Sequence, residues 1–206
     1  FPWINEVVDY VIKEGVYTCD YIVSLIERFE KNSKNKVLIV DDSEVVRLRI
    51  SQLLKIQNLQ VFTAENGHQA YKLLKEEEGI NLVLTDFNMP GYDGFQLVRK
   101  IREEFPPDKL SIIGMSGKES ERISSKFIRY GANDFVSKSY LNSQLLCRIN
   151  QNLTIIDQFG LMREFTLKDY LTKIYNRRYL FETGENIFES ALRNNNVPVI
   201  GMIDID

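Results

Sequence analysis

The chain has 206 residues, of which 44% are hydrophobic and 27% charged, and its net charge is −3. These are ordinary values for a globular protein, and without a visible basic face we expect no nucleic acid partner. The apolar runs fall short of the roughly 20 residues that span a bilayer, so we expect no membrane span and a cytoplasmic protein. Cys19 and Cys147 are too few for a disulfide framework, and we expect two buried free thiols.

The first 33 residues contain a short run that is similar to a later one. Residues 9–13 read Asp-Tyr-Val-Ile-Lys, residues 134–138 read Asp-Phe-Val-Ser-Lys, and a helical pattern follows each run. Residues 1–33 therefore resemble a last strand and last helix of an earlier copy of the domain that follows. The alternative is a plain N-terminal helix with a lead-in. A polar linker then covers residues 31–36.

The middle of the chain alternates short β-rich runs with helical patterns, which is typical of a parallel α/β sheet. Residues 36–40 are apolar after the first lysine, as in a strand that is buried on both faces. We expect five strands, at residues 36–40, 59–64, 81–85, 110–115 and 133–137. We expect five helices after them, at about residues 43–56, 66–77, 94–105, 118–130 and 140–156. The pattern predicts a doubly wound parallel sheet, whose sites lie at the carboxyl ends of its strands.

Polar residues stand at four of these predicted strand ends. Asp41 and Asp42 follow the first strand, Asp86 the third, Ser116 the fourth and Lys138 the fifth. We therefore expect three carboxylates, a hydroxyl and an ammonium group at one edge of the sheet. Asp42 taken alone is also explained as a helix cap.

This set of groups suits phosphoryl transfer. Clustered carboxylates repel one another unless a cation lies among them, and magnesium prefers such oxygen ligands. A magnesium ion at Asp41 or Asp42 and Asp86 would neutralise charge during transfer, with Asp86 as the nucleophile. Ser116 would donate its hydroxyl to one phosphoryl oxygen, and Lys138 would pair with another.

These residues resemble the receiver domain of two-component response regulators, a flavodoxin-like (βα)5 fold, over residues 35–153. The resemblance implies that Asp86 accepts phosphate from a sensor histidine kinase or phosphotransfer protein. The runs that carry it are Val-Asp-Asp-Ser at 40–43, Thr-Asp-Phe-Asn-Met-Pro-Gly-Tyr-Asp-Gly at 85–94, Met-Ser-Gly at 115–117, and Gly-Ala-Asn-Asp-Phe-Val-Ser-Lys at 131–138.

The resemblance assigns two further roles. The backbone carbonyl of Asn88 would be a metal ligand, and Phe135 would be the aromatic switch residue that turns inward as Ser116 moves. Phe135 as a plain core aromatic is an equal alternative. The family often has proline after its lysine, whereas this chain has Ser139, so we expect a trans peptide bond there. His68, the only histidine, lies away from the acidic edge, and we expect a surface residue and no phosphodonor.

The helical pattern that starts near residue 140 runs on beyond the receiver-like region. Leu146, Ile149, Leu153 and Ile156 follow a 3-and-4 spacing, which predicts a short coiled-coil seam, and we expect Gly160 to weaken the helix. We interpret residues 154–168 as a linker helix. The alternative is a terminal helix that packs on its own domain.

Residues 169–178 read Asp-Tyr-Leu-Thr-Lys-Ile-Tyr-Asn-Arg-Arg and resemble the opening of GGDEF domains, the catalytic unit of diguanylate cyclases. A helix is expected at about 177–194 and a strand at 197–203. We interpret 169–206 as the N-terminal part of a truncated GGDEF domain, with no cyclase activity of its own. The resemblance makes Asp204 and the carbonyl of Ile205 ligands of magnesium with GTP. The alternative is that Asp204 and Asp206 are ordinary residues at a strand end.

The leading hypothesis is a receiver that accepts phosphate on Asp86 and then forms a homodimer. Dimerisation would bring two GGDEF domains together to make cyclic di-GMP from GTP. In the alternative, the receiver is a phosphorylation-dependent interaction module and the GGDEF segment is degenerate and not catalytic. A third hypothesis, a phosphorelay intermediate, does not explain why a GGDEF-like segment is attached.

Overall fold

The computed structural model describes residues 18–117, 121–140, 143–199 and 201–202. The chain divides into two compact units, Phe1–Gln158 and Phe159–Asp206, which we describe separately. None of the helices in the described ranges is long and apolar enough to cross a membrane.

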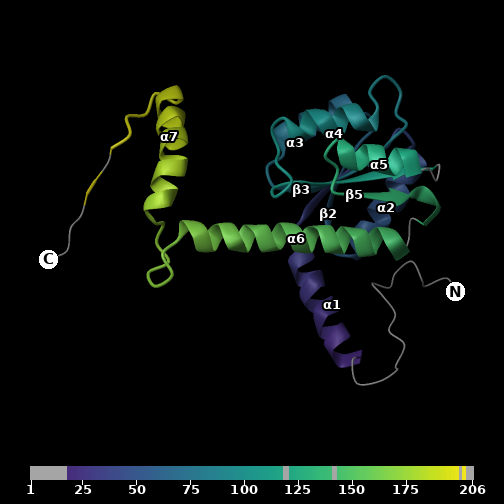
Figure 1. Ribbon diagram of the computed structural model, residues 1–206, viewed down its shortest axis with the longest axis horizontal. Coiled ribbons are helices and arrows are strands. Elements are labelled where there is room, and N and C mark those ends of the chain that lie inside the picture. The colour runs from purple at the N-terminus through teal and green to yellow at the C-terminus, as the bar shows by residue number, and fades with distance from the viewer. Residues whose placement is uncertain (1–17, 118–120, 141–142, 200, 203–206) are drawn as a thin grey trace. The chain divides into compact units, whose positions relative to one another are not determined.

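The first unit is built on a five-stranded parallel sheet in the order β2-β1-β3-β4-β5 (Figure 1). This order and the helices between the strands confirm the predicted flavodoxin-like α/β fold. The strands are β1 (Lys36–Val40), β2 (Gln60–Ala64), β3 (Ile80–Asp86), β4 (Ser111–Ser116) and β5 (Asp134–Ser137).

Helices cover both faces of this sheet (Figure 1). On one face lie the helices of residues 44–56 and 143–167, and the second of these buries Leu145, Ile149 and Leu153. On the other face, the helices of residues 67–76, 94–102 and 121–129 enclose the core. The helices are α1 (Thr18–Asn32), α2 (Glu44–Ile56), α3 (Gly67–Glu76), α4 (Gly94–Arg102), α5 (Glu121–Arg129) and α6 (Ser143–Leu167), with a 3-10 turn η2 (Lys138–Tyr140). Because helices cover both faces, the central strands β1, β3 and β4 are almost continuously buried, and the middle of each strand is apolar.

The predicted seam on the last helix lies mostly inside this core. Ile149 and Leu153 are fully buried against the sheet, and Leu146 packs at the edge of the same cluster. The expectation of a coiled-coil seam is therefore wrong at these three positions, where the alternative of a helix packed on its own domain holds, and for the half-buried Ile156 it stays a prediction. The helix also continues through Gly160 as far as Leu167.

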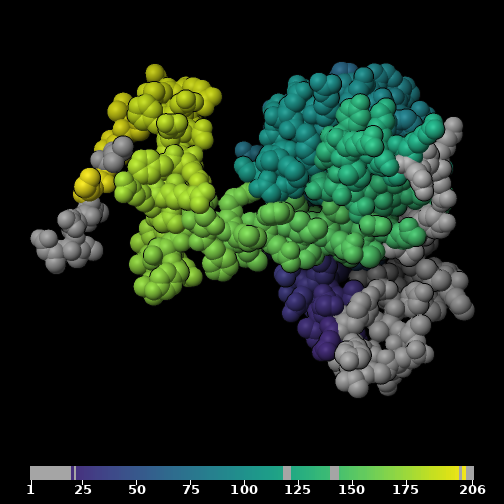
Figure 2. Space-filling view, viewed as in Figure 1, coloured from purple at the N-terminus to yellow at the C-terminus, as the bar shows by residue number. Residues whose placement is uncertain are grey.

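Within the first unit, helix α1 projects from the sheet and its covering helices (purple in Figure 2), and polar contacts join it to α6 and to the end of α2. Arg28 forms an ion pair with Asp157 of α6 at 2.9 Å. Beyond α2, the Asn32 side-chain amide donates to the Gln57 backbone carbonyl at 2.9 Å, and the Asn58 side-chain amide donates to the Phe29 backbone carbonyl at 3.1 Å. The strand that the repeat predicts at residues 9–13 lies outside the described residues.

The second unit contains α7 (Arg177–Arg193) and the turn before it. The Asp169 carboxylate accepts hydrogen bonds from the Thr172 amide at 2.9 Å and the Thr172 hydroxyl at 2.8 Å. These hydrogen bonds lower the pKa of Asp169. A single antiparallel bridge between Lys168 and Tyr175 closes the turn.

The strand predicted at residues 197–203 is not formed in its described part. Residues 197–199 and 201–202 have no strand pairing, and Val197, Val199 and Met202 are 86%, 90% and 97% exposed. Sequence preference alone does not make a strand, because its backbone needs a neighbouring strand for its hydrogen bonds.

A fully buried phenylalanine of α5 lies against a glycine of β4. A Cβ atom built on Gly114 would lie 2.6 Å from the Phe127 ring, closer than atoms pack in proteins. The ring thus occupies the volume that a side chain on β4 would need, and the two positions are matched in size.

Gly114→Ala should destabilise the first unit by about 1–3 kcal/mol, because added atoms in a filled core force its neighbours to shift. Urea denaturation followed by circular dichroism measures the loss. Gly117→Ala is the control, because a Cβ there has open space within 4 Å. Equal stability of the two variants would show that the Phe127 ring yields at no cost.

Candidate functional site

The strand ends bring distant residues to one edge of the sheet. Asp41 follows β1, Asp86 ends β3 and Ser116 ends β4, while Lys138 follows β5. The parallel register pairs Asp86 with Met115, and Ser116 with Ser137. Ser116 therefore lies one residue beyond the partner of Asp86, and Lys138 one residue beyond the partner of Ser116, so the polar residues gather at one edge of the sheet, as the sequence predicted.

Lys138 joins two of the carboxylates directly. Its Nζ lies 2.6 Å from Asp41 Oδ2 and 3.0 Å from Asp86 Oδ2. The side chains of Asp41, Asp86 and Lys138 are 0%, 7% and 17% exposed, so water screens these charges little. The Phe87 amide donates to Asp86 Oδ1 at 2.8 Å, which fixes the plane of the carboxylate.

Burial and charge act on these groups in opposite directions. Burial raises the pKa of Asp86, the charge of Asp41 adds to this, and the hydrogen bond and charge of Lys138 work against it. Burial tends to lower the pKa of Lys138, but its hydrogen bonds and charge interactions with Asp41 and Asp86 outweigh burial and raise it. The ammonium group is therefore held in its charged form beside carboxylates that need a cation.

The carboxylates of Asp41, Asp42 and Asp86 have the composition of a divalent cation site. One ligand atom from each lies within 4.8 Å of the others. A single ammonium group does not neutralise three carboxylates, and all-oxygen ligands of this kind suit magnesium. Asn88, whose carbonyl is a predicted ligand, lies two residues after Asp86 in the loop before α4, and it is exposed.

The structure assigns the helix cap to a different residue from Asp42. The N-cap of α2 is Ser43, whose own amide donates to Asp41 Oδ1 at 3.0 Å. The capping alternative for Asp42 is therefore wrong, and its exposed carboxylate remains open to the site.

Arg47 is a contributor that the sequence did not reveal. Its guanidinium donates to the backbone carbonyls of Asp41 at 2.6 Å and Asp42 at 3.1 Å, which holds the acidic loop in place. Only its position near the start of α2 could have suggested this, since an arginine on a helix surface is usually a solvated charge.

Three other predicted features can be located. Ser116 is buried at the end of β4. The half-buried Phe135 ring lies 5.7 Å from the Phe127 ring, which agrees with a core aromatic and leaves its switch role a prediction. The described residues contain no cis peptide bond, and the Ser139 amide donates to the Ser137 hydroxyl at 3.3 Å. The predicted ligands Asp204 and Ile205 lie outside the described residues.

Comparison with known families identifies the domain that contains the sheet. A model of the response regulator receiver domain matches residues 37–150, more than half of the chain. The chain belongs to this family. No GGDEF family model matches the chain.

Two solved structures resemble more of the chain than the receiver. One is described as a putative two-component system response regulator/GGDEF domain protein, with 37% identity, a TM-score of 0.73, and coverage of 76% of this chain and 64% of that one. A second, described as a probable two-component system response regulator/GGDEF domain protein, has 38% identity, a TM-score of 0.71, and coverage of 74% and 62%. This chain therefore spans less than two thirds of either protein.

A third structure matches the receiver alone. It is the response regulator protein TrrA from Thermotoga maritima in complex with Mg(2+)-BeF, with 26% identity and a TM-score of 0.52. The match covers 57% of this chain and 98% of that protein.

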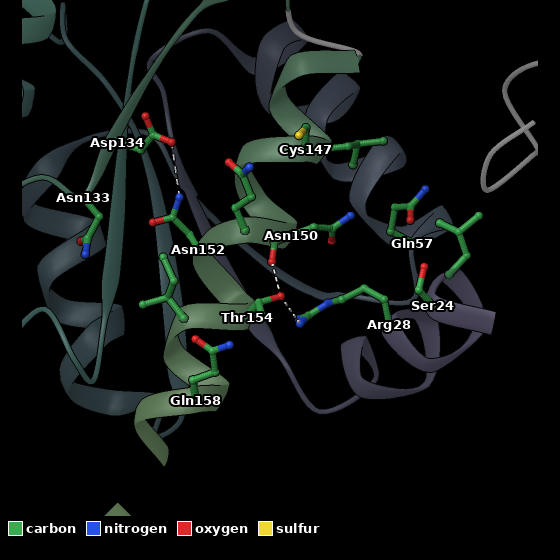
Figure 3. Close-up of a pocket in the computed structure, with 14 residues that line it drawn as sticks. Ser24, Arg28, Gln57, Asn133, Asp134, Cys147, Asn150, Asn152, Thr154 and Gln158 are labelled. Carbon is green, nitrogen blue, oxygen red and sulfur yellow. Dashed lines mark hydrogen bonds between the residues drawn. The ribbon is translucent and has the colours of Figure 1, made fainter. Parts of the chain in front are cut away.

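The receiver also has a hollow of about 910 Å³ between α1 and α6, away from the acidic edge (Figure 3). Carboxamides and hydroxyls dominate its lining, and its two charged residues are paired: Arg28 with Asp157, and Asp134 with Arg148 at 3.2 Å. This chemistry offers no nucleophile with a base, so the acidic edge remains the candidate site. Cys147 in this lining is exposed, which corrects the expectation of a buried thiol; the side chain of Cys19 lies outside the description.

His68 is exposed on α3, as predicted, with its ring 4.7 Å from that of Tyr92. Its position agrees with a surface residue that plays no part at the acidic edge.

Lys138→Met should lower the free energy of unfolding by about 3 kcal/mol, because two buried carboxylates lose their shared cation. Excess magnesium chloride should recover part of this loss. Urea denaturation with EDTA and then with magnesium measures both effects. Lys100→Met, which removes an exposed partner of Glu103, should change the stability by less than about 0.5 kcal/mol. A Lys138→Met protein as stable as the wild type would contradict the prediction.

Proposed function

We propose that this receiver accepts a phosphoryl group on Asp86 from a sensor histidine kinase or a phosphotransfer protein. The observation that carries the proposal is the Lys138 ammonium group shared between buried Asp41 and Asp86, with Asp42 beside them. An acceptor carboxylate needs a fixed cation close by, because the group that it attacks is itself an anion. The similar response regulator protein TrrA is described in complex with Mg(2+)-BeF, which supports a magnesium-dependent function for this receiver.

In the transfer, a carboxylate oxygen of Asp86 forms a bond to phosphorus while the bond from phosphorus to the donor's imidazole nitrogen breaks. The nitrogen keeps the electron pair of that bond. Lys138 then moves its hydrogen bond from Asp86 to a phosphoryl oxygen, and the Ser116 hydroxyl donates to another. The Phe87 backbone amide keeps the acceptor oriented throughout, since it donates to Asp86 Oδ1 and not to the oxygen Oδ2 that Lys138 contacts.

Asp41, Asp42, Asp86 and the backbone carbonyl of Asn88 would hold the magnesium ion. When bound, the ion neutralises the carboxylates and the phosphoryl oxygens during transfer. Arg47 contributes without touching the ion, because it fixes the carbonyls of Asp41 and Asp42. The bound ion and the Lys138 ammonium group would together supply the positive charge that the reaction requires.

The output that we propose is cyclic di-GMP synthesis by a GGDEF domain, of which residues 169–206 are the first part. The two response regulator/GGDEF proteins support this arrangement, since their similarity extends to about three quarters of this chain. In this proposal, Asp204 and the carbonyl of Ile205 contribute to a site for GTP with magnesium. Phosphorylation would favour a homodimer through the surface formed by α5, β5 and α6, and so bring two output domains together.

Incubation with acetyl phosphate and magnesium should add one phosphoryl group to the chain, detected by intact-protein mass spectrometry. Asp86→Asn should abolish the addition, because an amide is not a nucleophile of this kind. Asp20→Asn, at an exposed position on α1, is the matched control and should be labelled like the wild type. Labelling of Asp86→Asn at the wild-type level would place the acceptor elsewhere.

Beryllofluoride with magnesium should shift the protein from monomer to dimer in sedimentation velocity, because it mimics the phosphoryl group on Asp86. The Asp86→Asn protein should sediment alike with and without the reagent. An unchanged monomer–dimer balance in the wild type would contradict regulation by dimerisation, while leaving the phosphorylation of Asp86 standing.

A further inference from the structure

Helix α5 packs on the receiver through the buried Phe127 side chain. Among the α5 side chains that the structure describes, only Phe127 is fully buried (0% exposed), while Ile123 is half-buried. The exposed face of the helix carries three cations, Arg122, Lys126 and Arg129. The place of α5 on the sheet therefore depends mainly on where the Phe127 ring lies.

Two glycines make room for this ring. A Cβ atom built on Gly114 would lie 2.6 Å from the ring, and one built on Gly94 would lie 3.2 Å from its Cζ atom. Gly94 is also the first residue of α4, pressed against the Asp86 carbonyl, where a Cβ would come within 2.2 Å of the oxygen. The ring slot is thus bounded by the backbone next to the phosphorylation site.

The rings around Phe127 lead from the acidic edge to α5. The Phe87 amide holds Asp86 Oδ1, and the Phe87 ring meets that of Phe127 edge-on at 6.4 Å. The ring of Phe135, the predicted switch residue on β5, lies 5.7 Å from the Phe127 ring, and the ring of Phe95 lies 4.7 Å from it. Lys126 of α5 lies over the Phe95 ring at 4.3 Å.

We propose that Phe127 is the positioning residue that transmits the state of Asp86 to α5. This inference rests on the proposed phosphorylation of Asp86. Because protein interiors are close-packed, the rings of Phe87 and Phe135 cannot move without displacing the Phe127 ring, which both of them contact. Since that ring is the anchor of α5, the helix moves with it, and so does its basic face.

A side-chain swap separates this role from simple filling of the core. In the double variant Gly114→Leu, Phe127→Ala, the slot is filled from β4 instead of from α5. The control is Phe127→Leu, which keeps a filling side chain on α5. The readout is amide hydrogen exchange of residues 121–129, measured with and without beryllofluoride and magnesium.

In the wild type and in Phe127→Leu, we expect beryllofluoride to change the exchange rates of α5 by about fivefold or more, the lower end of typical coupling between sites. In the swapped variant, we expect beryllofluoride to bind within about twofold of the wild type, because the acidic edge is untouched, and the exchange of α5 to stay constant. A swapped variant whose α5 responds like the wild type would overturn the proposal.

A second measurement does not depend on the fold of the swapped variant. 4-Fluorophenylalanine incorporated at position 127 should show a shifted fluorine resonance when beryllofluoride is added to the otherwise wild-type protein. An unshifted resonance, with beryllofluoride bound, would overturn the role of Phe127. If beryllofluoride does not bind the wild type with magnesium, the proposed function itself fails, and the two failures are thereby distinguished.

Discussion

The sharing of one ammonium group between two buried carboxylates is the constraint on which the rest of the receiver depends. Asp41 and Asp86 end neighbouring strands, and both are almost withdrawn from water. Two such charges oppose folding unless a cation reaches them, and Lys138 can do so only if β5 lies beyond β4 at the matching level. The strand order and the register are therefore both needed to bring Lys138 to the two carboxylates.

Most of this arrangement could be predicted from the sequence, for identifiable reasons. A strand buried on both faces is apolar along its length, so β1, β3 and β4 were located to within about two residues, the usual precision for element ends. Once the strands are parallel, their carboxyl ends share an edge, and Asp41, Asp86 and Lys138 must meet. The magnesium ligands and the switch role of Phe135 rest on the family resemblance and stay predictions.

The predictions that were wrong concern local sequence patterns that fit more than one tertiary arrangement. The 3-and-4 spacing of Ile149 and Leu153 suits a helix pair and a helix on a sheet equally well, and the sheet buries both residues. The apolar run at 197–199 and 201–202 has strand preference but no paired neighbour. Arg47 binds two backbone carbonyls, and because every residue has a backbone carbonyl, the sequence does not indicate which ones an arginine will bind.

The contacts of α1 affect how the receiver can be dissected. A fragment that begins at the first strand would match the family boundary. In that fragment, however, the Asn58 side chain would lose its acceptor, the Phe29 carbonyl, and the Gln57 carbonyl would lose its donor, the Asn32 side chain. It would also leave Asp157 on α6 without its arginine. Water would have to replace these partners at the far end of α2. A version of this domain that starts near Thr18, ahead of the sequence signature that defines the family, should therefore be more stable than one that starts at the family boundary.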